Sequence, residues 1–319
     1  MALREPDPQA DVLARVQANI ERVIQGKGSV VRLLLLCLVA EGHLLLEDVP
    51  GVGKTSLAKA LAASLDCTFG RVQFTPDLLP SDVVGVNVWS RAEGRFEFRP
   101  GPIFAGVVLG DEINRASPKT QSALLEAMGE RQVTVDGVTY SMAPPFMVIA
   151  TQNPIEHEGT YPLPESQLDR FLMRLSVGYP SREAEVEVLE AHGDHDPLSA
   201  LQPVAGTDDI AALAEAARSV HVAPALREYL VDLADASRHH PQLALGMSPR
   251  ASLGLQRVAR ARAAAAGREF VVPDDLKALA HPVLDHRLLL TPEAQIQGYR
   301  SSDAVDDLLR TVPLPTGRG

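Results

Sequence analysis

A short glycine-rich segment carries residue types that bind phosphate groups. It lies between an apolar run at residues 43–47 and an Ala/Leu-rich helical pattern at residues 54–65. In such an order of strand, loop and helix, backbone N–H groups and the amino end of the helix face the phosphates. Lys54 is then placed to reach the β- and γ-phosphates, and the Thr55 hydroxyl to ligate Mg²⁺. The residues expected to hold a nucleotide are Pro50, Gly51, Val52, Gly53, Lys54, Thr55 and Ser56.

Two adjacent carboxylates, Asp111 and Glu112, end the apolar run at residues 107–110. A buried strand delivers them to its carboxyl end, the edge at which α/β sheets bind ligands. Asp111 is then placed to hold the Mg²⁺ of Thr55 through the water shell of the ion, and Glu112 to polarise the attacking water. An acidic pair after a strand is common by itself. Together with the loop at residues 50–56, the pair predicts an ATPase that uses ATP and Mg²⁺. A GTPase is not expected, because the sequence has no Asn-Lys-x-Asp motif.

The elements that must position these residues form an α/β domain. The runs at 43–47, 107–110 and 146–150 are continuously apolar, which is typical of parallel strands covered on both faces. Two helices are predicted before them, at residues 10–25 and 29–40, and Ser29 is expected to cap the second. The α/β domain is therefore expected to span residues 1–180.

Two hairpins interrupt this pattern. Residues 133–135 and 138–140 flank Asp136-Gly137, a two-residue turn typical of β-hairpins. A looser signal places a second hairpin at residues 84–89 and 95–99.

The strand signal vanishes after Arg182, and helical patterns follow. We predict a linker region at 181–198 and an all-α lid domain at 199–319. His192 and His195 lie in the linker and are expected to be solvated rather than metal ligands. The helical patterns cover residues 182–192, 208–218, 224–239, 249–266, 273–280 and 302–310.

Composition narrows the class of protein. The 319 residues carry a formal net charge of -11, so no global attraction draws the chain to nucleic acid or anionic membrane. The two cysteines, Cys37 and Cys67, are too few for a disulfide scaffold. The longest apolar run, residues 33–40, is shorter than a spanning helix, and the amino-terminal residues do not resemble a signal peptide. A cytoplasmic location is expected.

Five motifs together resemble those of the MoxR family of AAA+ ATPases, and the similarity runs from about residue 20 to 313. Asp48, where a strict P-loop has glycine, is familiar in that family, whereas Ser166 and Gly110 are minor departures from it. The motifs are Glu47–Thr55, Gly110–Ala116, Ala150–Glu156, Leu163–Phe171 and Ser248–Ala251.

The resemblance assigns further roles. Asn153 resembles the sensor 1 residue, which orients the attacking water. Arg170 resembles the arginine finger, which acts on the nucleotide of an adjacent subunit. Arg250 lies in the first turn of a lid helix, after Pro249 and after Ser248, which is expected to be the N-cap, and it resembles the sensor 2 arginine. The two hairpins resemble the helix-2 insert and the presensor-1 hairpin.

The function implied is chaperone-like remodelling or maturation of protein complexes by a homo-oligomer, expected to be a hexamer. The resemblance also implies a partner with a von Willebrand A domain. Two alternatives stay open, a nucleic-acid motor and a metal-chelatase ATPase subunit. The negative net charge, and the lack of a zinc-finger or helix-turn-helix accessory, argue against the first. The client is not written in the sequence.

Overall fold

Five parallel strands form the central sheet, in the order β2-β5-β8-β1-β9. The computed structural model describes residues 8–154, 159–191 and 197–315. The predicted neighbours β5 and β8 are paired, so Asp111 and Asn153 leave the sheet at the same edge. The strands are β1 (Leu44–Glu47), β2 (Phe69–Gln73), β5 (Val107–Asp111), β8 (Met147–Gln152) and β9 (Met173–Leu175).

Both faces of the sheet are covered, which explains the continuous apolar runs. Leu44 and Leu46 of β1 belong to one buried cluster and Leu45 to another, because successive side chains of a strand point to opposite faces. The first cluster includes α1 (Pro8–Glu21), α2 (Gly28–Val39) and α3 (Lys54–Ser64). The second includes α4 (Pro80–Val84), α5 (Pro118–Glu130) and the 3-10 turns η1 (Pro102–Phe104) and η2 (Ile113–Arg115). A short α6 (Glu165–Leu168) precedes β9.

Two details at the amino-terminal end differ from prediction. The first helix ends at Glu21, four residues before the predicted end. Ser29 does not cap the second helix, because α2 already begins at Gly28 and its N-cap is Lys27. Ser29 therefore lies in the first turn.

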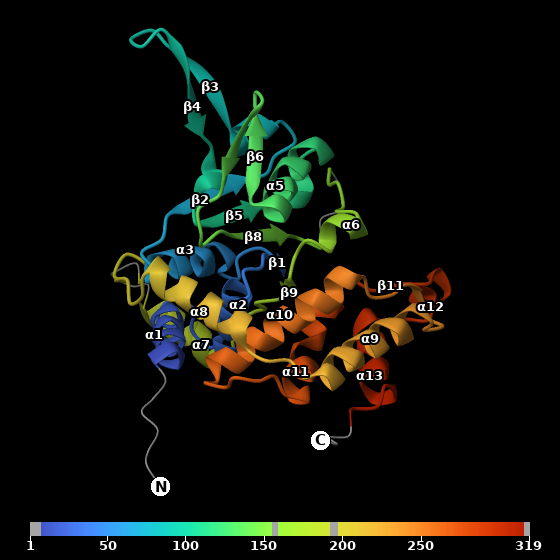
Figure 1. The fold of residues 1–319 in the computed structure, drawn as a ribbon. Helices are drawn as coiled ribbons and strands as arrows, with labels where there is room; N and C mark the ends of the chain where they lie inside the picture. The colour runs from blue at the N-terminus through green and yellow to red at the C-terminus, as the bar shows by residue number, and fades with distance from the viewer. Residues whose placement is uncertain (1–7, 155–158, 192–196, 316–319) are drawn as a thin grey trace.

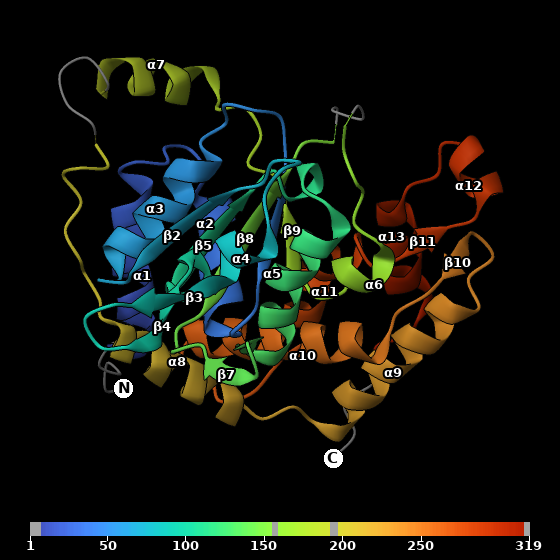
Figure 2. The same ribbon diagram turned by 90° about the horizontal axis from the view of Figure 1, so that it is seen from above.

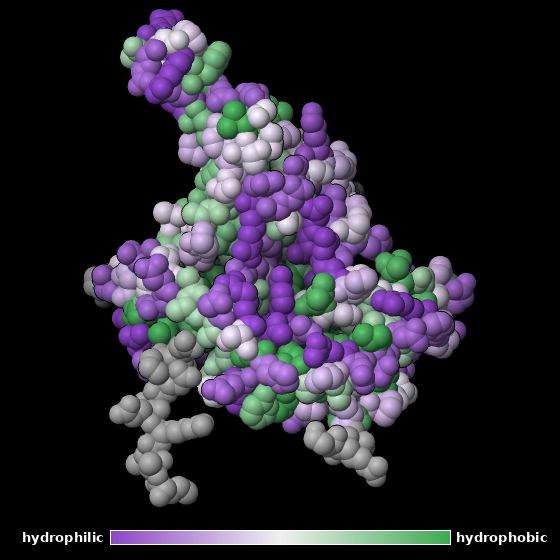
Figure 3. Space-filling view, viewed as in Figure 1, coloured by the Kyte–Doolittle hydropathy of each residue, from purple (hydrophilic) through white to green (hydrophobic). Residues whose placement is uncertain are grey.

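Both predicted hairpins are present and project from the sheet domain (Figure 1). They are β3 (Gly85–Ser90) with β4 (Arg95–Pro100), and β6 (Gln132–Val135) with β7 (Val138–Ser141). Phe98 and Tyr140 stack between them with ring centroids 4.1 Å apart. The Asn87 amide also donates a hydrogen bond of 2.7 Å to Asp136. Figure 3 shows the β3–β4 hairpin extending away from the body with both hydrophilic and apolar side chains on its surface.

The carboxyl-terminal part is a helical lid, as predicted (Figures 1 and 2). It also contains a two-stranded antiparallel ladder, β10–β11, which was not predicted. Its strands are too short to give a period-2 signal. α7 (Arg182–Ala191) lies within the predicted linker region. The elements after it are α8 (Thr207–Ser219), α9 (Pro224–Arg238), β10 (Leu243–Leu245), α10 (Pro249–Ala265), α11 (Pro273–Leu284), β11 (Leu289–Leu290), α12 (Pro292–Ile296) and α13 (Ser301–Thr311).

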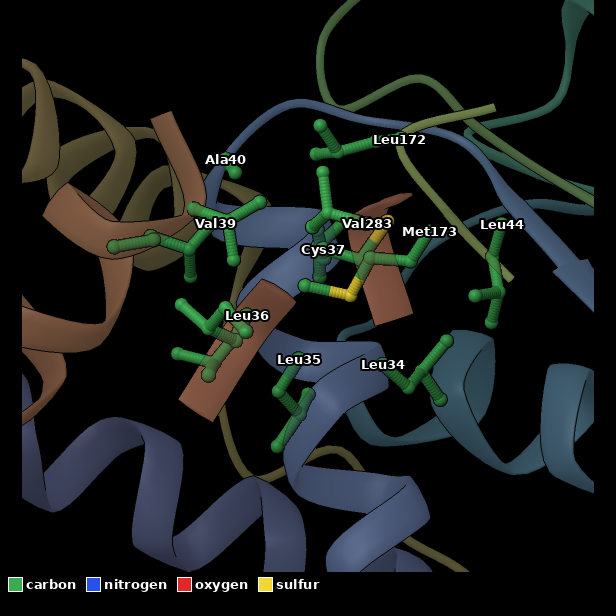
Figure 4. Close-up of a cluster of buried hydrophobic side chains, with 14 of the residues drawn as sticks. Leu34, Leu35, Leu36, Cys37, Val39, Ala40, Leu44, Leu172, Met173 and Val283 are labelled. Atoms are coloured by element: carbon green, nitrogen blue, oxygen red, sulfur yellow. The ribbon is translucent and has the colours of Figure 1, made fainter. Parts of the chain in front are cut away.

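The lid shares its core with the sheet domain. Figure 4 shows Val283 of α11 beside Cys37 of α2 and Met173 of β9, and all three belong to one buried cluster. Because α10 also packs on α2, the lid is joined to the sheet domain through apolar contacts as well as through the chain. The domain limits at residues 180 and 198 stay predictions.

Two expectations concern segments that the structure describes only in part. His192 and His195 lie outside the described residues. Within the described ranges, no group of three His, Cys, Asp or Glu side chains could hold a metal ion. In those same ranges the structure contains no helix that is both long and apolar enough to span a membrane.

Candidate functional site

A cavity of about 360 Å³ lies at the carboxyl ends of β1, β5 and β8. The structure thus brings together most of the residues predicted from the phosphate-binding loop and the carboxylate pair. Val52, Arg170 and Arg250 are not among the lining residues. Those are Pro50, Gly51, Gly53, Lys54, Thr55, Ser56, Asp111, Glu112 and Asn153.

The loop before α3 has the backbone conformation that glycine permits. Gly51 and Gly53 have φ angles of 84° and 89°, which side chains with a Cβ rarely adopt. Gly53 is the N-cap of α3, so the helix begins at Lys54 and directs the free N–H groups of its first turn toward the cavity. An amino end of a helix at the cavity favours anionic groups there.

Lys54 is the cation of the cavity. Its Nζ donates a hydrogen bond of 2.8 Å to the main-chain oxygen of Asp48. Burial lowers the pKa of Lys54, while the carboxylates of Asp48, Asp111 and Glu112 oppose that shift. A partly desolvated ammonium attracts phosphate more strongly than one in bulk water.

The Thr151 hydroxyl joins the two carboxylate residues. It donates to Asp111 Oδ1 at 2.7 Å and accepts the Glu112 backbone N–H at 2.9 Å. Thr151 is fully buried on β8, next to β5. The sequence analysis did not assign it a role, although it stands two residues before Asn153 in the same motif.

The Glu112 backbone lies in the left-handed region, with φ 57° and ψ 51°. This conformation costs free energy for a residue with a Cβ. It also turns the Glu112 side chain away from the direction of the strand. The Glu112 carboxylate accepts from the Gln73 amide at 3.1 Å and lies 3.3 Å from Arg115 Nε. Arg71 pairs with Asp111 Oδ2 at 2.8 Å. Gln73 and Arg71 lie on β2, a strand that the sequence analysis missed, so their contribution was missed as well.

These residues fit a nucleotide with Mg²⁺. Hard oxygen ligands suit Mg²⁺, and the cavity offers the Asp111 carboxylate and the Thr55 hydroxyl. The α3 amino end and Lys54 suit the phosphates. The site can therefore hold a metal–triphosphate group and present Glu112 and Asn153 beside it.

Arg170 and Arg250 line a different cavity of about 280 Å³, together with Gly42 and His43. Gly42 and His43 precede β1, whereas the phosphate-binding loop follows it. The two cavities therefore lie at opposite ends of β1, about 13 Å apart or more for a four-residue strand. Arg170 donates a hydrogen bond to the carbonyl of Leu125.

Asp169 connects the sheet domain to the lid at this second cavity. Its carboxylate accepts from the Ser248 hydroxyl at 3.0 Å and lies 3.9 Å from Arg250 Nη1 and 3.0 Å from Arg287 Nε. Arg287 also donates to the main-chain oxygen of Phe171 at 2.8 Å. Burial lowers the pKa of Arg287 to about 10, and Asp169 opposes that shift. Residues 169–171, which carry Arg170, are thus bonded to the lid.

Comparisons with known proteins agree with this architecture. The model of the ATPase family associated with various cellular activities (AAA) matches residues 43–173, and that of the AAA lid domain matches residues 235–308. The uncharacterized protein YeaC of Bacillus subtilis is 48% identical, over 96% of each chain. Chaperone MoxR1 of Mycobacterium tuberculosis is 42% identical, over 96% of this chain and 83% of its own.

A solved structure shows the same fold. A crystal structure from Cytophaga hutchinsonii, of a protein assigned as an ATPase, matches with a TM-score of 0.90 and 37% identity. The match covers 97% of this chain and 96% of that chain. With the sheet, the phosphate-binding loop, the helical lid and these relatives, the chain belongs to the MoxR family of AAA+ ATPases.

Proposed function

We propose that the protein hydrolyses ATP with Mg²⁺ and uses the reaction for chaperone-like remodelling or maturation of protein complexes. One observation carries the chemical part of the proposal. Lys54 and Thr55 meet Asp111, Glu112 and Asn153 around one cavity, although these residues come from three separate strand ends. That set holds phosphates, ligates a hard cation and activates water.

Each residue has a role that follows from its chemistry. Lys54 and the N–H groups of the α3 amino end bind the β- and γ-phosphates. Thr55 and Asp111 would hold Mg²⁺, which neutralises phosphate charge when bound. Glu112 accepts a proton from the attacking water, and the Asn153 amide orients that water.

Arg170 and Arg250 act on the nucleotide of a neighbouring subunit in this proposal. Both line a cavity at the end of β1 opposite to the phosphate-binding loop, so neither is beside the nucleotide of its own chain. In a closed ring, head-to-tail contact brings one such cavity to the nucleotide site of the next subunit. We infer a homo-oligomer, and a hexamer from the family resemblance.

The client side of the proposal rests on resemblance. One close relative is called a chaperone, and its similarity covers nearly the whole chain. The two projecting hairpins offer surfaces for a partner protein, for which a von Willebrand A domain protein is our candidate. The β3–β4 hairpin exposes Trp89 and Phe96, whose ring centroids lie 5.2 Å apart.

The nucleotide chemistry is tested by two substitutions. Lys54→Ala is expected to abolish ATP binding, because the cation of the cavity is removed. Glu112→Gln is expected to bind ATP and to hydrolyse it about 10²- to 10⁴-fold more slowly, since the general base is lost. Isothermal titration and phosphate release measure the two effects. Normal turnover by Glu112→Gln protein would show that Glu112 is not the base.

The same Glu112→Gln protein tests the client. Loaded with ATP, it is expected to retain a protein partner in a pull-down from the native cell, because the ATP-bound complex is no longer depleted by hydrolysis. A nucleic-acid motor would instead show ATPase stimulation by DNA or RNA, with binding that weakens steeply as salt rises. Stimulation by nucleic acid that is absent from Lys54→Ala protein would overturn the chaperone proposal.

A further inference from the structure

Asp48 occupies the position at which a strict P-loop has glycine, and the backbone does not explain the difference. Asp48 is not among the residues with positive φ, in contrast to Gly51 and Gly53 of the same loop. The position therefore does not need the conformational freedom of glycine. The residue is only 8% exposed. A buried carboxylate requires compensating hydrogen bonds.

Those hydrogen bonds come from a single short segment, residues 176–178. Asp48 Oδ2 accepts from the Val177 backbone N–H at 2.6 Å, from the Gly178 backbone N–H at 2.7 Å and from the Ser176 hydroxyl at 3.0 Å. Oδ1 accepts the N–H of its own neighbour, Val49, at 3.1 Å. One carboxylate oxygen thus binds three consecutive residues that lie 128 to 130 positions away in the chain.

Residues 176–178 lie between the central sheet and α7. Residue 176 continues from β9, which is paired with β1, so Asp48 and residues 176–178 leave adjacent strands at one edge. Lys27 Nζ holds the next residue, donating to the Tyr179 carbonyl at 2.7 Å. Three residues later the chain enters α7, on the route to the lid. The carboxylate therefore bonds the phosphate-binding loop to the start of that route.

The main-chain oxygen of Asp48 is also the acceptor of the Lys54 ammonium. A Lys54 ammonium that turned to a bound phosphate would give up this hydrogen bond, and the residue that would lose it is Asp48, which holds residues 176–178. Asp48 thus contacts the phosphate-binding lysine through its backbone and the lid connection through its side chain.

We propose that Asp48 is a positioning residue that couples the nucleotide state of the phosphate-binding loop to the segment 176–178 and the start of α7. The inference rests on the proposed ATPase function for its ligand. Asp48 itself touches no reacting atom. At the position where a strict P-loop has glycine, the Asp48 carboxylate would transmit a change in loop conformation to residues 176–178 and the start of α7.

Hydrogen exchange at the Val177 and Gly178 amides tests the contact directly. In the wild-type chain both amides are expected to exchange slowly, and binding of a non-hydrolysable ATP analogue is expected to change that rate. In Asp48→Asn protein they are expected to exchange about tenfold faster or more, because hydrogen bonds to a charged acceptor are replaced by weaker ones. The analogue is expected to bind this variant and to leave the two amides unchanged.

A pair of substitutions on the opposite side of the contact controls for misfolding at Asp48. Ser176→Ala removes one donor and is expected to accelerate exchange at the two amides less than Asp48→Asn does. Ser176→Thr keeps the hydroxyl and is expected to retain the wild-type exchange rates. Asp209→Asn is the matched control, since Asp209 also accepts a backbone N–H, that of Gly206, but does so at the start of α8. Tryptic cleavage after the exposed Arg182 gives a second readout of the same segment.

The outcomes separate the two proposals. Wild-type rates at Val177 and Gly178 in Asp48→Asn protein would overturn the contact, and an analogue response that survives in that variant would overturn the coupling. A wild-type chain that binds no ATP would overturn the proposed function instead. The difference between the two proteins without nucleotide would still decide whether Asp48 holds the segment.

Discussion

The Thr151 hydroxyl makes the two carboxylate residues act as one unit. It is the shared partner of the Asp111 side chain and the Glu112 backbone, and it lies on the strand that also leads to Asn153. A hydroxyl can serve both because it donates one proton and accepts on its lone pairs. The orientations of Asp111, the proposed metal ligand, and of Glu112, the proposed base, therefore depend on Thr151, which does not itself line the cavity.

Thr151→Val tests this role. Valine has nearly the same shape, leaves the Glu112 N–H without an acceptor and removes a donor from Asp111. We expect kcat to fall about 10- to 100-fold, the worth of a lost hydrogen bond to a charged group, with little change in ATP affinity. Thr151→Ser keeps the hydroxyl and is expected to retain activity, so equal kcat values for the two variants would contradict the assignment. Steady-state kinetics and nucleotide titration supply both quantities.

His43 gives the protein a pH-dependent component of stability. Its Nδ1 accepts the Val148 N–H at 3.0 Å, so its Nε2 must donate to the Met128 carbonyl, also at 3.0 Å. Burial lowers the pKa of His43 from 6.5 to about 4. The folded state therefore holds the neutral ring. The unfolded chain binds a proton first as pH falls, so this stabilisation is complete above pH 6.5 and is lost as pH falls toward 4.

We therefore expect the free energy of unfolding to decrease by on the order of 3 kcal/mol through His43 alone between pH 7 and pH 4. Urea unfolding at a series of pH values measures it. His43→Gln lacks the titration, so its unfolding free energy is expected to be lower at pH 7 but to fall less steeply with acid. Parallel curves for the two proteins would rule out His43 as the cause.

At the scale of elements, the amino end of α10 is where the lid is bonded to the sheet domain. The Ser248 hydroxyl accepts the Ala251 N–H at 3.0 Å, as the sequence predicted for an N-cap, and also donates to Asp169. Arg250 lies in the first turn of this helix. The cap therefore fixes Arg250 relative to Arg170, which follows Asp169 directly.

Ser248→Ala is expected to lower the free energy of unfolding by about 1–2 kcal/mol, because both the helix cap and the bond to Asp169 are lost. Ser248→Thr preserves both hydrogen bonds and is expected to cost less. Chemical denaturation compares the two variants. If alanine costs no more than threonine, the hydroxyl does not hold the lid in place.

At the scale of the whole molecule, the decisive feature is that the two candidate cavities lie at opposite ends of β1. The cavity with the phosphate-binding loop contains Glu112, the proposed base, and the other contains Arg170 and Arg250. In our proposal each chain therefore presents two half-sites, which an oligomer would unite.

Mixing two inactive proteins tests this arrangement. Arg170→Ala supplies an intact nucleotide cavity, and Lys54→Ala supplies an intact arginine. Mixed oligomers are expected to recover part of the ATPase activity, and an arginine finger is worth about 10³- to 10⁵-fold in rate, so the signal is large. Activity per chain is also expected to rise with protein concentration. Mixed oligomers that form without any recovery would place Arg170 in cis or outside catalysis.

Much of the nucleotide cavity could be predicted from the sequence because its signals are local. The apolar run, the glycine loop and the helix around Lys54 lie within about 25 residues, and Asp111 ends a strand that is recognisable by itself. The general rule that ligands bind at the carboxyl ends of parallel strands then placed the pieces together. The helices of the lid were predicted for the same reason, since a 3.6-residue period is visible in the chain.

Contacts between residues far apart in the chain were decided only by the tertiary structure. The strand β2, with Arg71 and Gln73 beside the carboxylates, contains polar residues and lacks the continuous apolar run by which β1, β5 and β8 were recognised. The sequence named Asp48 but not its partners 128 to 130 residues away. It named Arg170 and Arg250 but could not tell at which end of β1 they lie. Composition and periodicity report the environment of a residue, whereas a partner depends on how distant strands and helices are stacked.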